Sequence, residues 1–221
     1  PTGTVAVSSD HVVVDDLIYI GGREITFALT VSDNRTAAAN IQVSARNEGD
    51  TWSSSETAAS ALTWTLPPGD GSRAVDVRFL DRAGNETVER TYFVVDTAPP
   101  KIAHQPITLV DQHSSISITA DVSDAAPVSV RLHYRPGGRE EYIATDMAGD
   151  GTYHTSVSAF DVALGVAYYI EAKDIRGAIT TFPATGAEAA IGVAIRGRFS
   201  QENSLTPYAW HMFSVPFSPT S

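Results

Sequence analysis

Several turns of this sequence carry aspartate or asparagine, whose side-chain oxygens are the ligands that calcium prefers. The candidates are Asp33, Asp81, Asn85 and Asp96. Asp and Asn also favour turns for a backbone reason, because they accept hydrogen bonds from their own main chain and tolerate the left-handed conformation. No D-x-D-x-D-G loop is present. The sequence therefore favours plain turns and keeps calcium as the alternative, and no other cofactor is expected.

Catalytic patterns are missing from the sequence. None of the six histidines pairs with another at i+2 or i+4, and there is no G-x-S-x-G, P-loop or HExxH segment. The chain has no cysteine, which excludes a thiolate nucleophile and cysteine-bound zinc. We expect a protein that is not an enzyme.

Sugar binding would need exposed aromatic side chains. Trp52 lies in a polar loop and is the candidate for an exposed ring, whereas Trp64 lies within "LTWTL" and is expected in a core. A single exposed ring is not a platform, so the sequence gives sugar binding little support.

The formal net charge of −11 excludes several classes of partner. No basic stripe is present, so nucleic acid is not an expected ligand. No apolar run is long enough to insert into a membrane. The absence of cysteine fits a prokaryotic protein that folds on packing alone.

The dominant pattern is the alternation of apolar and polar residues that half-buried strands show. Six segments have it, and they begin at residues 23, 40, 73, 115, 127 and 166. In the third, "RAVDVRFLD", the pattern places Val75 and Val77 inside and Asp76 toward water. Turns such as "PPGDG" and "RPGG" separate the segments, and no convincing helical period occurs. An all-β fold of antiparallel sheets follows.

The chain repeats itself after about 90 residues, the size of one β-sandwich domain. "TVSD" at 30–33 returns as "DVSD" at 121–124, and "DRAGN" at 81–85 returns as "DIRGA" at 174–178. Between the two copies "VVDTAPPKI" has two prolines that stiffen a short linker. We predict one domain over residues 1–98 and a second over 99–198.

Residues 199–221 fit neither domain, and they are too apolar for a free tail. The residues predicted to form an interface are Tyr208, Trp210, Met212 and Phe213. This segment either packs on the second domain, begins a following β module, or pairs with the sheet edge of another molecule. Because the chain starts at Pro1 and stops within this segment, we expect an internal fragment of a longer polypeptide.

Two stretches resemble known domains. "TWTLPPGDGSRAVDVRFLDRAGNETVERTYFVVDTAPP" resembles the closing half of a bacterial immunoglobulin-like domain of large surface and secreted proteins. "PKIAHQP", "VSVRLHYRPGG" and "YYIEAKDIRG" are similar to a prokaryotic fibronectin type III domain. The resemblance implies two tandem immunoglobulin-like antiparallel β-sandwiches, and it covers about residues 1–196.

The preferred interpretation is a non-catalytic segment of a large extracellular or cell-surface prokaryotic protein, acting as a stalk, spacer or filament subunit. Its partners would be neighbouring domains of the same polypeptide. Self-assembly through the C-terminal segment or through sheet edges is a further expectation. One alternative is an adhesin module that binds a glycan or a protein, and another is a non-catalytic appendage of a secreted hydrolase.

Overall fold

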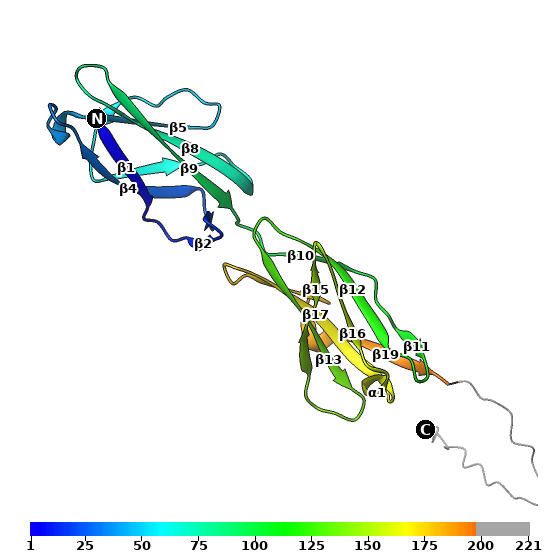
Figure 1. Ribbon diagram of the computed structural model, residues 1–221. Coiled ribbons are helices and arrows are strands. Elements are labelled where there is room, and N and C mark those ends of the chain that lie inside the picture. The colour runs from blue at the N-terminus through cyan, green and yellow to red at the C-terminus, as the bar shows by residue number, and fades with distance from the viewer. Residues whose placement is uncertain (198–221) are drawn as a thin grey trace, which may run out of the picture.

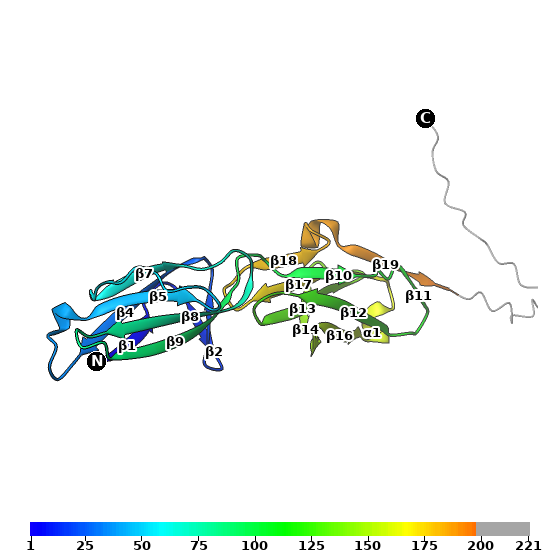
Figure 2. The same cartoon turned by 90° about the horizontal axis from the view of Figure 1, so that it is seen from above.

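The computed structural model describes residues 1–197. They form two β-sandwich units that lie end to end (Figure 1). The view from above shows the same elongated arrangement (Figure 2). The predicted residues Tyr208, Trp210, Met212 and Phe213 lie outside the described residues.

The first unit contains nine strands and one short 3-10 turn. They are β1 (Thr2–Val7), β2 (Val12–Val14), β3 (Leu17–Ile20), β4 (Glu24–Ser32), η1 (Ala38–Asn40), β5 (Gln42–Asn47), β6 (Glu56–Thr57), β7 (Ala61–Thr65), β8 (Gly71–Leu80) and β9 (Glu86–Val95). One sheet has the order β1-β4-β7, and the other has the order β2-β3-β9-β8-β5-β6. The β3–β9 pair is parallel, and the other pairs of these two sheets are antiparallel.

The second unit repeats this plan. Its elements are β10 (Lys101–His104), β11 (Leu109–Asp111), β12 (Ile116–Ser123), β13 (Val128–Pro136), β14 (Ile143–Asp146), β15 (Ala148–Asp150), β16 (Thr152–Val157), α1 (Ala159–Val162), β17 (Val166–Asp174), β18 (Ile179–Phe182), η2 (Gly186–Ala189) and β19 (Ile191–Arg196). One sheet has the order β10-β12-β16-β15, and the other has β11-β19-β17-β13-β14 with β18 also paired to β17. Here β11 and β19 are the parallel pair.

Each unit has a hydrophobic core of its own between its two sheets. The first core takes Ile25 and Phe27 from β4, and the second takes Ile118 from β12 and Ile170 from β17. These residues stood on the apolar faces of the predicted strands, because alternate side chains of a strand point to one side of its sheet. The all-β prediction is confirmed. The boundary at residue 98 stays a prediction.

Asp76 departs from the predicted pattern. It was expected to point to water, yet it is only 3% exposed. Its carboxylate lies in the middle of β8, directly opposite Arg46 of β5 and Arg90 of β9. Both arginines donate to it, Arg46 Nε at 2.9 Å and Arg90 Nε at 2.7 Å. The two long side chains cover the aspartate, so a polar position on the outer face of the sheet becomes buried.

Candidate functional site at the junction of the units

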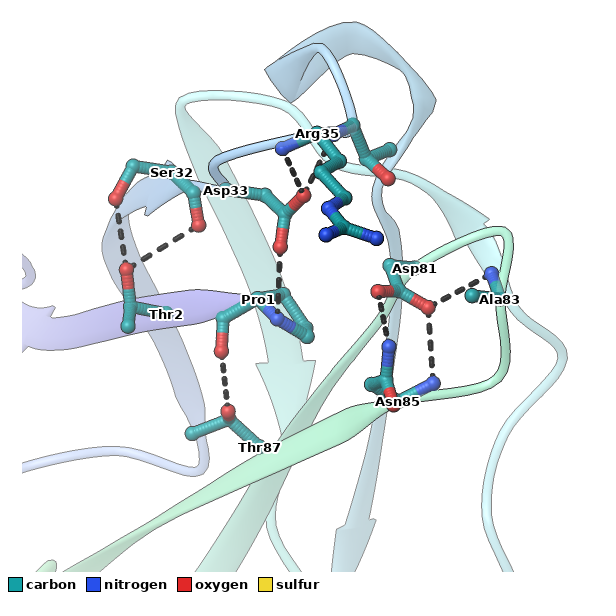
Figure 3. A network of polar contacts seen from close by, with 10 residues as sticks. Pro1, Thr2, Ser32, Asp33, Arg35, Asp81, Ala83, Asn85 and Thr87 are labelled. Carbon is teal, nitrogen blue, oxygen red and sulfur yellow. Dashed lines mark hydrogen bonds and ion pairs between the residues drawn. The ribbon is translucent and has the colours of Figure 1, made fainter.

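The "DRAGN" segment forms a tight turn between β8 and β9 (Figure 3). One oxygen of Asp81 accepts hydrogen bonds from the backbone N–H groups of Ala83 and Asn85, both at 2.8 Å. The other oxygen accepts from Nδ2 of Asn85 at 2.8 Å. The bond from Asn85 leads the contacts that hold the pKa of Asp81 below its usual value. Gly84 adopts a φ of 89°, which favours glycine. The turn interpretation of this motif is confirmed.

The corresponding "DIRGA" segment forms the same turn between β17 and β18. The backbone N–H of Asp174 donates to the carbonyl of Ala178 at 3.1 Å, and the N–H of Ala178 donates to Oδ1 of Asp174 at 2.9 Å. Gly177 has a φ of 95° and matches Gly84. The two copies differ at one point. Ala178 has no side-chain amide, so Oδ2 of Asp174 lacks the hydrogen bond that Asn85 gives to Asp81.

The four residues predicted as calcium ligands do not come together. Asp33, Asp81 and Asn85 lie at the end of the first unit that Figure 3 shows. Oδ1 of Asp33 accepts from the backbone N–H groups of Arg35 and Thr36, which lower the pKa of Asp33 to about 2. Asp96 follows the last residue of β9, whose ten residues span about 33 Å. One ion cannot bind all four residues, because Asp96 lies at the opposite end of the unit.

Asp96 instead meets two aspartates of the second unit. Carboxylate oxygens of Asp96, Asp124 and Asp174 all lie within 4.8 Å of one another. Asp124 directly follows β12 and Asp174 ends β17. Asp124 and Asp174 occupy the places in the repeat that Asp33 and Asp81 have in the first unit. The predicted ligands Asp33 and Asp81 therefore lie in turns of the first unit, whereas the cluster contains the corresponding aspartates of the second unit.

Burial and mutual repulsion dominate the electrostatics of this cluster. Asp96 is 3% exposed, and within residues 1–197 neither of its carboxylate oxygens has a hydrogen-bond partner. Burial raises the pKa of Asp96 to about 6, and the charges of Asp124, Asp174 and Asp70 add to the effect, whereas Arg176 opposes it. Burial also raises the pKa of Asp124. Such an arrangement disfavours three negative charges unless a cation lies among them.

An apolar cluster lies at the same junction. It has three buried members, Tyr19 and Val94 of the first unit and Ala126 of the second. Partly buried side chains that pack against them are Val12, Val14, Ala125 and Ile175. Ile175 belongs to the "DIRGA" turn, so this turn contributes to both the apolar and the acidic parts of the junction.

Arg176 of the same turn reaches back to the first unit. Its Nη1 donates to the carbonyl of Tyr19 at 3.2 Å, and its Nη2 donates to Asp10 at 3.3 Å. The guanidinium packs closely over Gly21, where a Cβ would lie 2.5 Å from Nη2. The junction thus combines apolar packing with directional polar contacts.

The ring of Trp52 is covered by positive charge. The guanidinium carbons of Arg46 and Arg78 lie 4.3 and 4.5 Å from the ring centroid. This position holds Trp52 against the outer face of the sheet through cation–π contacts. Trp52 as a sugar-binding residue stays an untested alternative. Trp64 packs against the core of the first unit and donates from Nε1 to Asn47 at 2.9 Å.

Two histidines of the second unit, His104 and His133, pack or hydrogen-bond within that unit. Nδ1 of His104 lies 2.7 Å from the carbonyl of Thr119, and its Nε2 lies 2.8 Å from the hydroxyl of Tyr168. His133 stacks on Tyr169 with ring centroids 4.5 Å apart.

In residues 1–197 no helix is long and apolar enough to cross a membrane.

Comparisons with known proteins identify the fold. No family model and no curated protein matches the sequence. The chain is similar to the structure of three tandem immunoglobulin domains of titin, with 12% identity and a TM-score of 0.54, over 80% of this chain and 61% of that one. It is also similar to a tetra-tandem repeat from the extending region of a large adhesion protein, with 15% identity and a TM-score of 0.41, over 81% of this chain and 47% of that one.

The chain thus spans less than two thirds of each of these structures. A likeness at such low identity defines the fold alone. Together with the two sandwiches and their separate cores, it shows that the fold of this chain is two tandem immunoglobulin-like domains.

Proposed function

We propose that this chain is a non-catalytic spacer in a larger extracellular prokaryotic protein, in which the two units act as one stiff rod. The observation that carries the proposal is the apolar cluster shared by both units, with Tyr19 and Val94 on one side and Ala126 on the other. Domains of one chain move relative to each other unless their interface is apolar enough to hold them. The resemblance of the sequence to bacterial surface domains supports the extracellular setting.

The elongated arrangement also supports this role. In both views the first unit lies at one end of the second, so that each unit adds its full length (Figures 1 and 2). Only residues 96–100 connect β9 to β10, which leaves little chain for independent motion. A spacer needs length and stiffness, and this arrangement supports both.

Self-assembly by strand addition stays a prediction. Most edge strands of the described sheets are short, such as β2 with three residues and β6 with two. Short edges discourage pairing with another chain. The longest edges are β1, with six residues, and β7, with five, so an added strand would be expected there.

Residual dipolar couplings test the stiff rod. If the two units move as one body, backbone couplings from both will fit a single alignment tensor. Changing Ile175→Asp places a charge in the junction cluster and should give each unit its own tensor. Ile179→Asp is the matched control, because Ile179 is 52% exposed on β18 of the same unit. Different tensors for the two units of the unchanged chain would contradict the proposal.

A further inference from the structure

We propose that Asp96, Asp124 and Asp174 together bind one divalent cation of the calcium class at the junction of the two units. Asp96 comes from the segment that leaves the first unit, and the other two belong to the second. The binding itself can be measured independently of the spacer role. The effect of the bound ion on the stiffness of the rod rests on the proposed spacer function.

The buried carboxylate of Asp96 lacks the partners that a buried charge needs. Its side chain is 3% exposed, and in the part of the chain that the structure describes both oxygens lack a hydrogen-bond partner, as does Oδ2 of Asp124. A buried carboxylate without a partner is strongly destabilising. Oxygens of the three carboxylates lie within 4.8 Å of one another, so each would repel the others when ionised. A bound cation removes both penalties at once.

Arg176 does not supply the positive charge that the acidic cluster needs. It is a nearby cationic side chain, and its charge opposes the raised pKa of Asp96. However, its hydrogen bonds in the described structure go to the carbonyl of Tyr19 and to Asp10. The acidic cluster therefore retains an excess of negative charge, although Arg176 lies beside it and donates its hydrogen bonds elsewhere.

The donor set and its dimensions fit calcium. All three groups are carboxylates, which calcium binds at 2.3–2.6 Å, so two oxygens on opposite sides of the ion stand about 4.6–5.2 Å apart. The oxygens of the cluster lie within 4.8 Å of one another. Zinc prefers nitrogen and sulfur ligands, and the cluster has neither. A pocket of about 250 Å³, whose lining includes Asp96, Asp174 and Arg176, gives room for water molecules to complete the coordination.

The repeat shows how the second copy of the turn acquires a free ligand. In the first unit Nδ2 of Asn85 donates a hydrogen bond to Oδ2 of Asp81. In the second unit Ala178 replaces that asparagine, while the backbone bond to Oδ1 of Asp174 remains at 2.9 Å. The turn is kept, and one oxygen of its aspartate becomes available to an ion.

An ion bound there would connect the two units. Asp96 is the first residue of the segment that joins the units, and the other two ligands lie in the second unit, so bending at the junction would separate the ligands from the ion. An ion that binds only the assembled site stabilises it by a free energy that grows with the logarithm of the ion concentration divided by the dissociation constant. Calcium would therefore stiffen the rod, in addition to the apolar cluster.

Isothermal titration of the chelator-treated chain with calcium chloride is the direct test. We expect one ion per chain and a higher melting temperature in calcium than in chelator. Asp174→Asn and Asp96→Asn should each weaken binding by at least about tenfold, because affinity follows the number of charged ligands. Asp146→Asn is the control, since Asp146 is an aspartate of the second unit outside the cluster and its side chain is 82% exposed.

A second measurement separates a metal site from a structural role. In chelator both ligand variants should melt at a higher temperature than the unchanged chain, because one of three repelling charges is gone. A merely structural aspartate would give a lower melting temperature on substitution. The proposal is overturned if the unchanged chain shows neither heat nor a melting shift with calcium, or if the ligand variants bind as it does. Calcium binding with separate alignment tensors for the units would instead refute the spacer role and leave the site intact.

Discussion

Asp76 provides the sharpest test of how the first unit is stabilised. Its buried carboxylate receives Arg46 Nε at 2.9 Å, Arg90 Nε at 2.7 Å and Arg90 Nη2 at 3.1 Å. The variant Asp76→Asn keeps the shape of the side chain but removes the charge and one acceptor oxygen. The two arginines then face each other without an anion between them.

The magnitude follows from these contacts. A hydrogen bond to a charged group contributes about 1.5–3 kcal/mol, and Asp76→Asn removes the bidentate contact with Arg90. The side chains of Arg46 and Arg90 are 35% and 39% exposed, so water replaces part of the loss. We expect a destabilisation of about 2 kcal/mol, which lowers the melting temperature of a domain this size by about 10 °C.

Calorimetry at several pH values checks this reasoning. The bond from Arg90 is the main cause that lowers the pKa of Asp76 in the folded state. A lowered pKa gives stability that is fully present above the unfolded value of about 3.9 and is lost as the pH falls through the folded value. The gap between the unchanged chain and Asp76→Asn should therefore begin to shrink below about pH 4 and continue to shrink as the pH falls further.

Glu48→Gln is the matched control, because Glu48 pairs with the same Arg90 at 3.3 Å but is exposed. It should leave the melting temperature almost unchanged. An unchanged melting temperature in Asp76→Asn at neutral pH, or a gap of equal size at pH 3 and pH 7, would refute the argument.

Three further substitutions test other parts of the fold by urea denaturation. Trp52→Ala should lower the stability of the first unit by about 1 kcal/mol, because two cation–π contacts are lost, and an unchanged midpoint would contradict this. Gly84→Ala should cost about 1–2 kcal/mol because of its positive φ, whereas the control Gly22→Ala, which has open space and no positive φ, should cost much less. Tyr168→Phe should destabilise the second unit by about 1–2 kcal/mol, because its hydroxyl accepts from the N–H of Ile107 at 2.9 Å, and equal stability would show that this bond is dispensable.

Much of the fold was predictable because the core strands alternate cleanly. The predicted strand at 23–33 is β4, and its Ile25, Phe27 and Leu29 are buried. The weaker segments were less predictable. The stretch 56–62, which is not among the alternating segments, contains β6 and the start of β7. Edge strands this short leave too few residues for a period to show.

The candidate site was only partly predictable. Asp96 was placed at a domain junction from its position before two prolines. Asp124 and Asp174 were not identified, because their contact with Asp96 joins segments far apart in the chain and depends on how the units dock. The signal that could have found them is the exchange of Asn85 for Ala178 in otherwise matching turns. The burial of Asp76 was missed because alternation predicts the face of a strand and not what neighbouring arginines cover.

The two parallel strand pairs have a consequence for pulling force. β3 is parallel to β9 through Tyr19 and Val94, and β11 is parallel to β19 through Val110 and Ile195. When a unit is stretched from its two ends, the strands of such a pair slide past each other, so their hydrogen bonds are loaded together rather than opened one at a time. Each unit therefore contains a shear-loaded pair near the strand by which the chain leaves it. Because the two units follow each other along the chain, both parallel strand pairs would bear the same tension.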